Sequence, residues 1–277
     1  MIRKAYLDTP LAGGTIQTHY RTAGEGRPLV LLHPSPMSSA FLVPVIETGR
    51  DLFRVIALDT PGYGASDPLP EPGDDLVPYC DWLEAVLDGF DLEQVVLYGS
   101  ATGAQVAIEF AISRPHRVDA LVLENAVHFE DEERVDIMAN YFPSLAPQED
   151  GSHLAEAWRM ADGLFRGFPW YEAPSGGPAP PVALVHATVM AYLVAGEDYA
   201  RAYKAAFNNE RAERLAQVPV STTVMRWAGS LLREQADRFD NYEWPPHIAM
   251  QYSDASPEAR FSALRSVFAA LADGQSH

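Results

Sequence analysis

The residues most suggestive of chemistry are Gly-Ser-Ala-Thr-Gly at positions 99–103. They follow the apolar run at 94–98 and precede a helical pattern at 104–113, so they predict a turn from a strand into a helix. Glycines on both sides permit a strained backbone at the centre of such a turn. A serine, aspartate or cysteine at this centre would be a nucleophile, whereas the methyl group of Ala101 cannot form a covalent intermediate.

The elements that must position this turn alternate between strands and helices. Residues 4–8 and 15–22 predict an opening antiparallel hairpin with Gly13-Gly14 at its turn. Short apolar runs predict strands buried on both faces at 29–32, 53–58, 94–98 and 120–123, and helical patterns occupy 77–90 and 104–113. This alternation predicts an α/β fold with a mostly parallel, doubly wound sheet.

After Asn125 the alternation stops for almost ninety residues. Helix-like pieces lie at 155–165, 182–193 and 198–216, with a Pro/Gly-rich stretch at 169–181, and a strand-like run returns at 220–227. The last helix is expected over 257–272. We therefore predict a core domain of residues 1–128 and 217–277, and a helical cap of residues 129–216 inserted before the last two strands.

Two further motifs accompany the turn at 99–103. The sequence Leu-His-Pro-Ser-Pro at 32–36 follows the first parallel-type run, and Asp-Thr-Pro-Gly-Tyr-Gly-Ala-Ser-Asp at 59–67 follows the second. With these motifs the chain resembles the capped α/β-hydrolase superfamily over nearly its whole length. In that superfamily the strand-to-helix turn is the nucleophile elbow, Gly-x-Ser-x-Gly in its usual form. Here Ala101 occupies the nucleophile position.

The resemblance implies an oxyanion hole made by two backbone N–H groups, those of Ser35 and Thr102. It also implies that His33 supports the loop that carries Ser35. Pro34 replaces the usual glycine of this loop, which fixes a local φ but leaves the backbone donors in place.

The resemblance further implies a catalytic base between the last strand and the last helix. His247 is the only histidine of that region, and we expect it to be the base. The usual acid position after the strand at 220–227 has no aspartate. Glu124, near the alternative position that precedes the cap, is a candidate acid. It lies one residue early, and one residue reverses the direction of a side chain in a strand.

The cap is expected to supply most contacts with the substrate, by resemblance. Its aromatic residues suit a small hydrophobic or aromatic molecule, although most of them are expected to pack against the sheet. His153 and Trp158 are the candidate cap residues for the pocket. No phosphate-binding loop, dinucleotide motif or metal-ligand spacing occurs, so we expect no cofactor and no metal.

Three explanations of Ala101 remain open. In the first, alanine replaces the elbow side chain of a working hydrolase, which is inactive or impaired in this form. In the second, the chain is a cofactor-independent lyase or acid–base enzyme that uses His247 and the oxyanion hole. Under the first explanation the replaced residue need not be serine, because the chain is similar to members of the superfamily with His-Thr-Gly at this point, and a histidine there favours acid–base or carbon–carbon cleavage chemistry. In the third, the chain is a ligand-binding protein without catalysis.

The composition limits the kinds of partner that the chain is expected to bind. The formal net charge of −18 would repel nucleic acid and anionic membranes. The single cysteine, Cys80, excludes an internal disulfide. No apolar run is long enough to span a bilayer and the first ten residues lack a signal-peptide pattern, so we expect a cytoplasmic protein. A small molecule is the expected partner of a monomer or homodimer.

Overall fold

The fold is seen in a computed structural model that describes residues 1–71, 73–174, 176 and 179–274. Its sheet has the order β1-β2-β4-β3-β5-β6-β7-β8. The strands are β1 (Arg3–Leu11), β2 (Gly14–Ala23), β3 (Pro28–Leu32), β4 (Arg54–Leu58), β5 (Val95–Ser100), β6 (Val118–Glu124), β7 (Thr222–Trp227) and β8 (Ile248–Ser253). β1 and β2 form an antiparallel hairpin, β2 pairs antiparallel with β4, and β3 to β8 are parallel.

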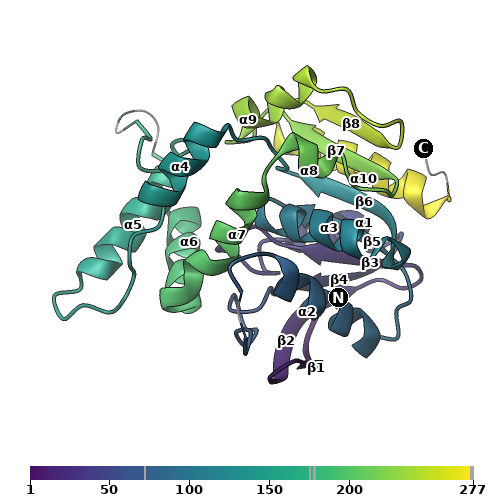
Figure 1. Cartoon of the computed structure of the whole chain (residues 1–277), viewed down its shortest axis with the longest axis horizontal. Coiled ribbons are helices and arrows are strands. Elements are labelled where there is room, and N and C mark those ends of the chain that lie inside the picture. The colour runs from purple at the N-terminus through teal and green to yellow at the C-terminus, as the bar shows by residue number, and fades with distance from the viewer. Residues whose placement is uncertain (72, 175, 177–178, 275–277) are drawn as a thin grey trace.

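Helices cover both faces of the sheet, as Figure 1 shows. α2 (Val77–Gly89) and α3 (Thr102–Ser113) pack on one face around Trp82 and Phe110, and α1 (Val43–Gly49) and α10 (Pro257–Ala272) pack on the other around Phe268. Each central strand is apolar on both sides because helices bury both of its faces. The predicted mostly parallel, doubly wound α/β sheet is therefore confirmed.

The described residues between β6 and β7 form helices and connecting loops but no strand. The helices are α4 (Asp131–Asn140), α5 (Ser152–Leu164), α6 (Val182–Ala195), α7 (Arg201–Asn209) and α8 (Ala212–Leu215), and α9 (Arg233–Asp237) follows β7. Short 3-10 helices lie at η1 (Pro115–Arg117), η2 (Gly196–Ala200) and η3 (Arg238–Asn241). α4, α5, α6 and α7 extend away from the sheet in Figure 1. Their separation as a cap domain stays a prediction.

An aromatic cluster forms the interior of this helical segment. Tyr141 contacts the rings of Phe168, Tyr203 and Phe207 at centroid distances of 5.4 to 5.6 Å. Most cap aromatics thus pack against one another rather than against the sheet. Within the described residues no helix is long and apolar enough to cross a membrane.

Candidate active site

Ala101 lies between β5 and α3 with φ 47° and ψ −113°. Its N–H donates to Glu124 O over 3.0 Å, and its carbonyl accepts from Ala104 N over 2.8 Å. A Cβ on Gly99 would lie 2.3 Å from Gly103 O, and one on Gly103 would lie 2.4 Å from Leu32 O. Both glycines are therefore needed sterically, and the strained residue between them faces a cavity.

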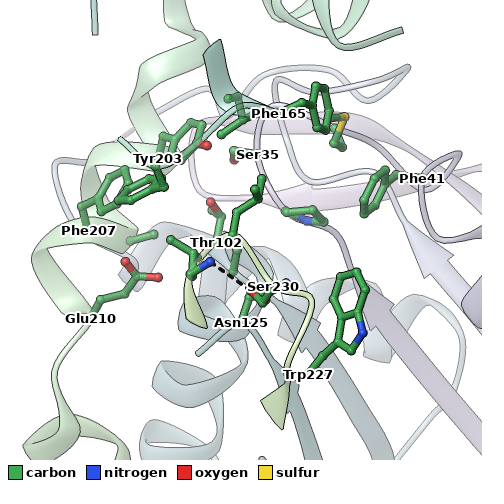
Figure 2. Close-up of a pocket in the computed structure, with 18 of the residues that line it drawn as sticks. Ser35, Phe41, Thr102, Asn125, Phe165, Tyr203, Phe207, Glu210, Trp227 and Ser230 are labelled. Carbon is green, nitrogen blue, oxygen red and sulfur yellow. Dashed lines mark hydrogen bonds between the residues drawn. The ribbon is translucent and has the colours of Figure 1, made fainter. Parts of the chain in front are cut away.

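The cavity above Ala101 has a volume of about 420 Å³, within the range of small-molecule sites. Figure 2 shows that its walls come from loops after the strands and from the helical segment. Four aromatic residues of the helical segment line it, namely Phe165, Phe168, Tyr203 and Phe207. The remaining wall is mainly aliphatic, with a few polar groups. An apolar molecule with one or two polar atoms fits this lining.

Ser35 and Thr102 line the cavity beside Ala101. Thr102 is the first residue of α3, so its N–H has no partner within the helix. Ser35 N donates no hydrogen bond to any residue that the structure describes. Both side-chain hydroxyls are buried without a hydrogen-bond partner among the same residues. Two backbone donors and two hydroxyls are thus available to a ligand oxygen.

His33 lies behind this loop and does not line the cavity. Its Nε2 accepts from Thr60 N over 2.9 Å, and its Nδ1 lies 3.0 Å from Pro34 O. Burial lowers the pKa of His33, which keeps the ring neutral so that Nε2 can accept. These contacts suit a supporting role.

The structure does not bring His247, the expected catalytic base, to the cavity beside Ala101. The run at 220–227 contains β7, and a further strand, β8, begins directly after His247. Since β8 runs parallel to β7, His247 lies at the amino end of its strand, and its Nε2 lies 2.8 Å from Val218 O. In the register of the sheet Gln251 is level with Met225, and Met225 with Glu124. His247 is thus about 13 Å along the strand from the level of the elbow.

Glu124 ends β6 and points away from the cavity. Its carboxylate lies 2.6 Å from both Nε and Nη2 of Arg260, and it accepts from the Tyr98 hydroxyl over 2.6 Å. No histidine contacts it among the described residues. The next residue, Asn125, does line the cavity, where its Oδ1 accepts from the Ser230 hydroxyl over 2.7 Å. The one-residue offset therefore directs Glu124 to a buried ion pair instead of a catalytic role.

The two cap candidates do not line the cavity. Trp158 is 43% exposed on α5. His153 is near the start of α5, where its Nδ1 accepts from Gln148 N over 3.1 Å. Both lie on the outer part of the helical segment because the side of α5 that packs inward carries Ala157, Met160 and Ala161.

Glu210 lines the cavity, although it was not among the site residues expected from the sequence. It follows α7 and is only 3% exposed. A signal was available, because Tyr203, Ala206, Phe207 and Glu210 repeat at the spacing of one helix face, and all four line the cavity. Burial raises the pKa of the Glu210 carboxyl well above its usual value.

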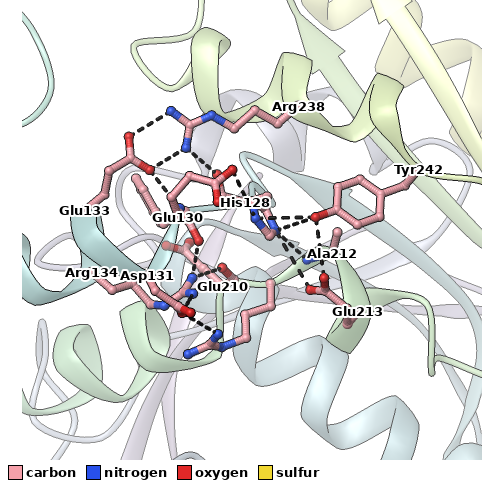
Figure 3. A network of polar contacts seen from close by, with 12 residues as sticks. His128, Glu130, Asp131, Glu133, Arg134, Glu210, Ala212, Glu213, Arg238 and Tyr242 are labelled. Carbon is pink, nitrogen blue, oxygen red and sulfur yellow. Dashed lines mark hydrogen bonds and ion pairs between the residues drawn. The ribbon is translucent and has the colours of Figure 1, made fainter.

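Among the described residues, no histidine lines the cavity, and no group of three or more His, Cys, Asp or Glu side chains could hold a metal ion. Figure 3 shows where a further histidine, His128, lies. Its Nδ1 accepts from Ala212 N over 3.1 Å, so it joins the two ends of the helical segment. The cavity thus places the backbone of Ser35 and Thr102 beside a strained turn whose central side chain is only a methyl group.

Comparison with known proteins agrees with this geometry. A family model described as the alpha/beta hydrolase fold matches residues 27–156. A 2-hydroxy-6-oxononadienedioate/2-hydroxy-6-oxononatrienedioate hydrolase of Escherichia coli O139:H28 is 32% identical over 126 residues, and the match covers 43% of each chain. The chain thus spans less than half the length of the curated relatives that it matches.

Solved structures match almost the whole chain at low identity. An epoxide hydrolase A from Mycobacterium thermoresistibile aligns with a TM-score of 0.67 and 17% identity, over 99% of this chain and 98% of that one. A meta-cleavage product hydrolase from Pseudomonas fluorescens IP01 also aligns with a TM-score of 0.67 and 17% identity, over 98% of both chains. The family-model match, the sheet order and the turn geometry at Ala101 together show that the chain has the α/β-hydrolase fold.

Proposed function

We propose that this chain is an enzyme that acts on a small, uncharged, apolar or aromatic carbonyl compound, and that its missing catalytic side chain belongs at position 101. The observation that carries the proposal is the strained elbow at Ala101. It presents an inert methyl group to an apolar cavity beside two unpaired backbone N–H groups. Such donors stabilise negative charge that develops on a carbonyl oxygen.

The positions of the histidines favour acid–base chemistry at residue 101 over a serine nucleophile. A serine needs a neighbouring base to become nucleophilic, and no histidine among the described residues lines the cavity. A histidine at position 101 would instead bring its own base to the elbow. It could accept the hydroxyl proton of a β-hydroxy ketone while the carbon–carbon bond breaks and the electrons pass to the carbonyl oxygen. Protonation of the resulting enolate would complete a retro-aldol cleavage.

The charge of the cavity bears on the class of substrate. The curated relative is named for an oxo compound with two carboxylates. The one arginine that lines the described part of this cavity, Arg260, is already bound to Glu124. The one carboxyl group that lines the described part of the cavity, that of Glu210, forms no ion pair with any residue that the structure describes. We therefore propose that the substrate keeps the carbonyl group of such compounds and lacks their negative charges.

The test compares the chain with its Ala101→Ser and Ala101→His variants. The substrates are phenyl acetate and 4-hydroxy-4-phenylbutan-2-one, whose cleavage gives benzaldehyde and acetone. We expect turnover only for Ala101→His and only on the hydroxy ketone. Ala101→Asn is the matched control, because it fills similar space without a titratable base.

Other outcomes point to other functions. Ester turnover by Ala101→Ser would contradict acid–base chemistry and indicate a serine hydrolase. Tight binding of the ketone without turnover by any variant would contradict the enzyme and favour a ligand-binding protein.

A further inference from the structure

Glu210 has a setting that the proposed reaction does not use. It is nine-tenths or more buried and lines the cavity, and Figure 2 shows its carboxyl group among the other residues of the wall. Its side chain accepts or donates no hydrogen bond and forms no ion pair with any residue that the structure describes. The carboxyl oxygens are accessible from the cavity, where a ligand or water can provide the hydrogen bonds that the protein does not.

The backbone of Glu210 is firmly held. Its carbonyl oxygen accepts from Phe129 N over 3.3 Å and from Arg134 Nη1 over 3.2 Å, and its N–H donates to Ala206 O over 3.0 Å. Figure 3 shows Arg134 within a network of ion pairs at the base of the helical segment. Arg134 Nη2 pairs with Asp131 and not with the Glu210 carboxyl. The main chain is therefore fixed, while the carboxyl is left to face the cavity.

The groups around the carboxyl do not favour its ionised form strongly. Arg134 on α4 is the nearby cation, and its charge offsets only part of the effect of burial on the pKa of Glu210. Tyr203 on α7 faces the same space, and burial raises the pKa of Tyr203 to about 12, so its phenol stays neutral. His128 is engaged with Ala212 N, and Arg260 lines the cavity but is bound to Glu124.

We propose that Glu210 determines substrate specificity by donating a hydrogen bond from a neutral carboxyl group to a second oxygen of the substrate. In the proposed function the carbonyl oxygen of the substrate lies at Ser35 N and Thr102 N. A hydrogen bond from Glu210 to a second oxygen therefore defines the substrate class as small aryl compounds with two oxygen functions. A neutral carboxylic acid in an apolar site is an effective donor. This inference rests on the proposed function for the position of the first oxygen.

The ligand-independent test is infrared difference spectroscopy of the whole chain against its Glu210→Gln variant at pH 7. We expect the carbonyl band of a protonated carboxyl group in the chain with Glu210. Glu132→Gln, on the exposed side of α4, is the matched control and should not remove that band. A Glu210 that is ionised at pH 7 would overturn the inference whatever the cavity binds.

The ligand test uses phenyl diketones whose carbonyl groups are separated by two or three carbons, each compared with the phenyl monoketone of equal length. We expect at least one diketone to bind about tenfold more tightly than its monoketone, the worth of one hydrogen bond. Glu210→Gln should keep this preference because its amide is still a donor, and Glu210→Leu should lose it.

The pH dependence separates the carboxyl from the amide. With Glu210, the preference for the diketone should be present below the pKa of Glu210 and lost above it, since an ionised carboxylate repels a carbonyl oxygen. In Glu210→Gln it should not change with pH. An equal preference in the chain and in Glu210→Leu would overturn this inference. If Ala101→His were active at the same time, the proposed function would still hold.

Failure of all ketones to bind, with Glu210 protonated, would overturn both the proposed function and the substrate class inferred here.

Discussion

Glu124 and Glu210 are both buried, at 1% and 3% exposed, and they belong to different parts of the fold, the sheet and the helical segment. Glu124 ends β6 and has two nitrogens of Arg260 and the hydroxyl of Tyr98 around it. Glu210 follows α7 and has no side-chain partner in the described part of the chain. Glu124 of the sheet thus binds Arg260 of α10, whereas Glu210 of the helical segment lines the cavity.

The largest expected effect comes from breaking the first of these two sites. Glu124→Ala should lower the free energy of unfolding by about 3 to 5 kcal/mol, because it leaves the buried guanidinium of Arg260 without its partner. Urea denaturation measures the change. In the double variant Glu124→Leu with Arg260→Met the loss should be much smaller, since both charges are then gone. An equal loss in the single and double variants would contradict the ion-pair explanation.

The second site, Glu210, should change how the free energy of unfolding depends on pH. Because the pKa of Glu210 is raised in the folded chain, the folded state keeps a proton that the unfolded state releases above about pH 4.5. The contribution of Glu210 to stability is therefore complete at lower pH. It should fall by up to about 1.4 kcal/mol per pH unit until the folded-state pKa is passed.

The free energy of unfolding of the Glu210→Gln variant should not show this fall with rising pH. Denaturation of the two chains in parallel across pH 4 to 8 measures the difference between them. Parallel curves over the whole range would show that Glu210 ionises normally.

Ala101, whose N–H donates to Glu124 O, has a strained backbone, and this strain can be relieved. Ala101→Gly should raise the free energy of unfolding by about 1 kcal/mol, since glycine adopts φ 47° without the clash of a Cβ. Thermal unfolding at fixed pH provides the comparison. Thr102→Gly changes a residue of ordinary helical backbone and should destabilise instead. No gain from Ala101→Gly would mean that the elbow is not strained.

The smallest effect is expected at the far end of the sheet. His247→Ala, introduced into the Ala101→His variant, should leave kcat unchanged, because His247 lies at the amino end of β8. His247→Gln is the control that can keep the contact with Val218 O. A large drop in kcat for both variants would return His247 to the active site.

The parts that were predicted from the sequence have strong local patterns. The inner parallel strands are continuous apolar runs, and the elbow glycines fix a turn that close backbone contacts demand. β8 was not located, since it is an edge strand in which only Ile248 is buried. Because β8 was not located, His247 was expected at the carboxyl end of the sheet, whereas it lies at the amino end of β8. Glu210 was missed because charge is expected on a helix surface, whereas tertiary packing buries this one.

A crystal structure of this chain with 4-hydroxy-4-phenylbutan-2-one tests the account most directly. We expect no turnover of the bound ligand, since Ala101 has no group that can take a proton. We expect the ketone oxygen within hydrogen-bond distance of Ser35 N and Thr102 N, above the methyl group of Ala101, with the phenyl ring among the cap aromatics. A ligand bound outside this cavity, or a ketone oxygen directed at Arg260, would contradict the account.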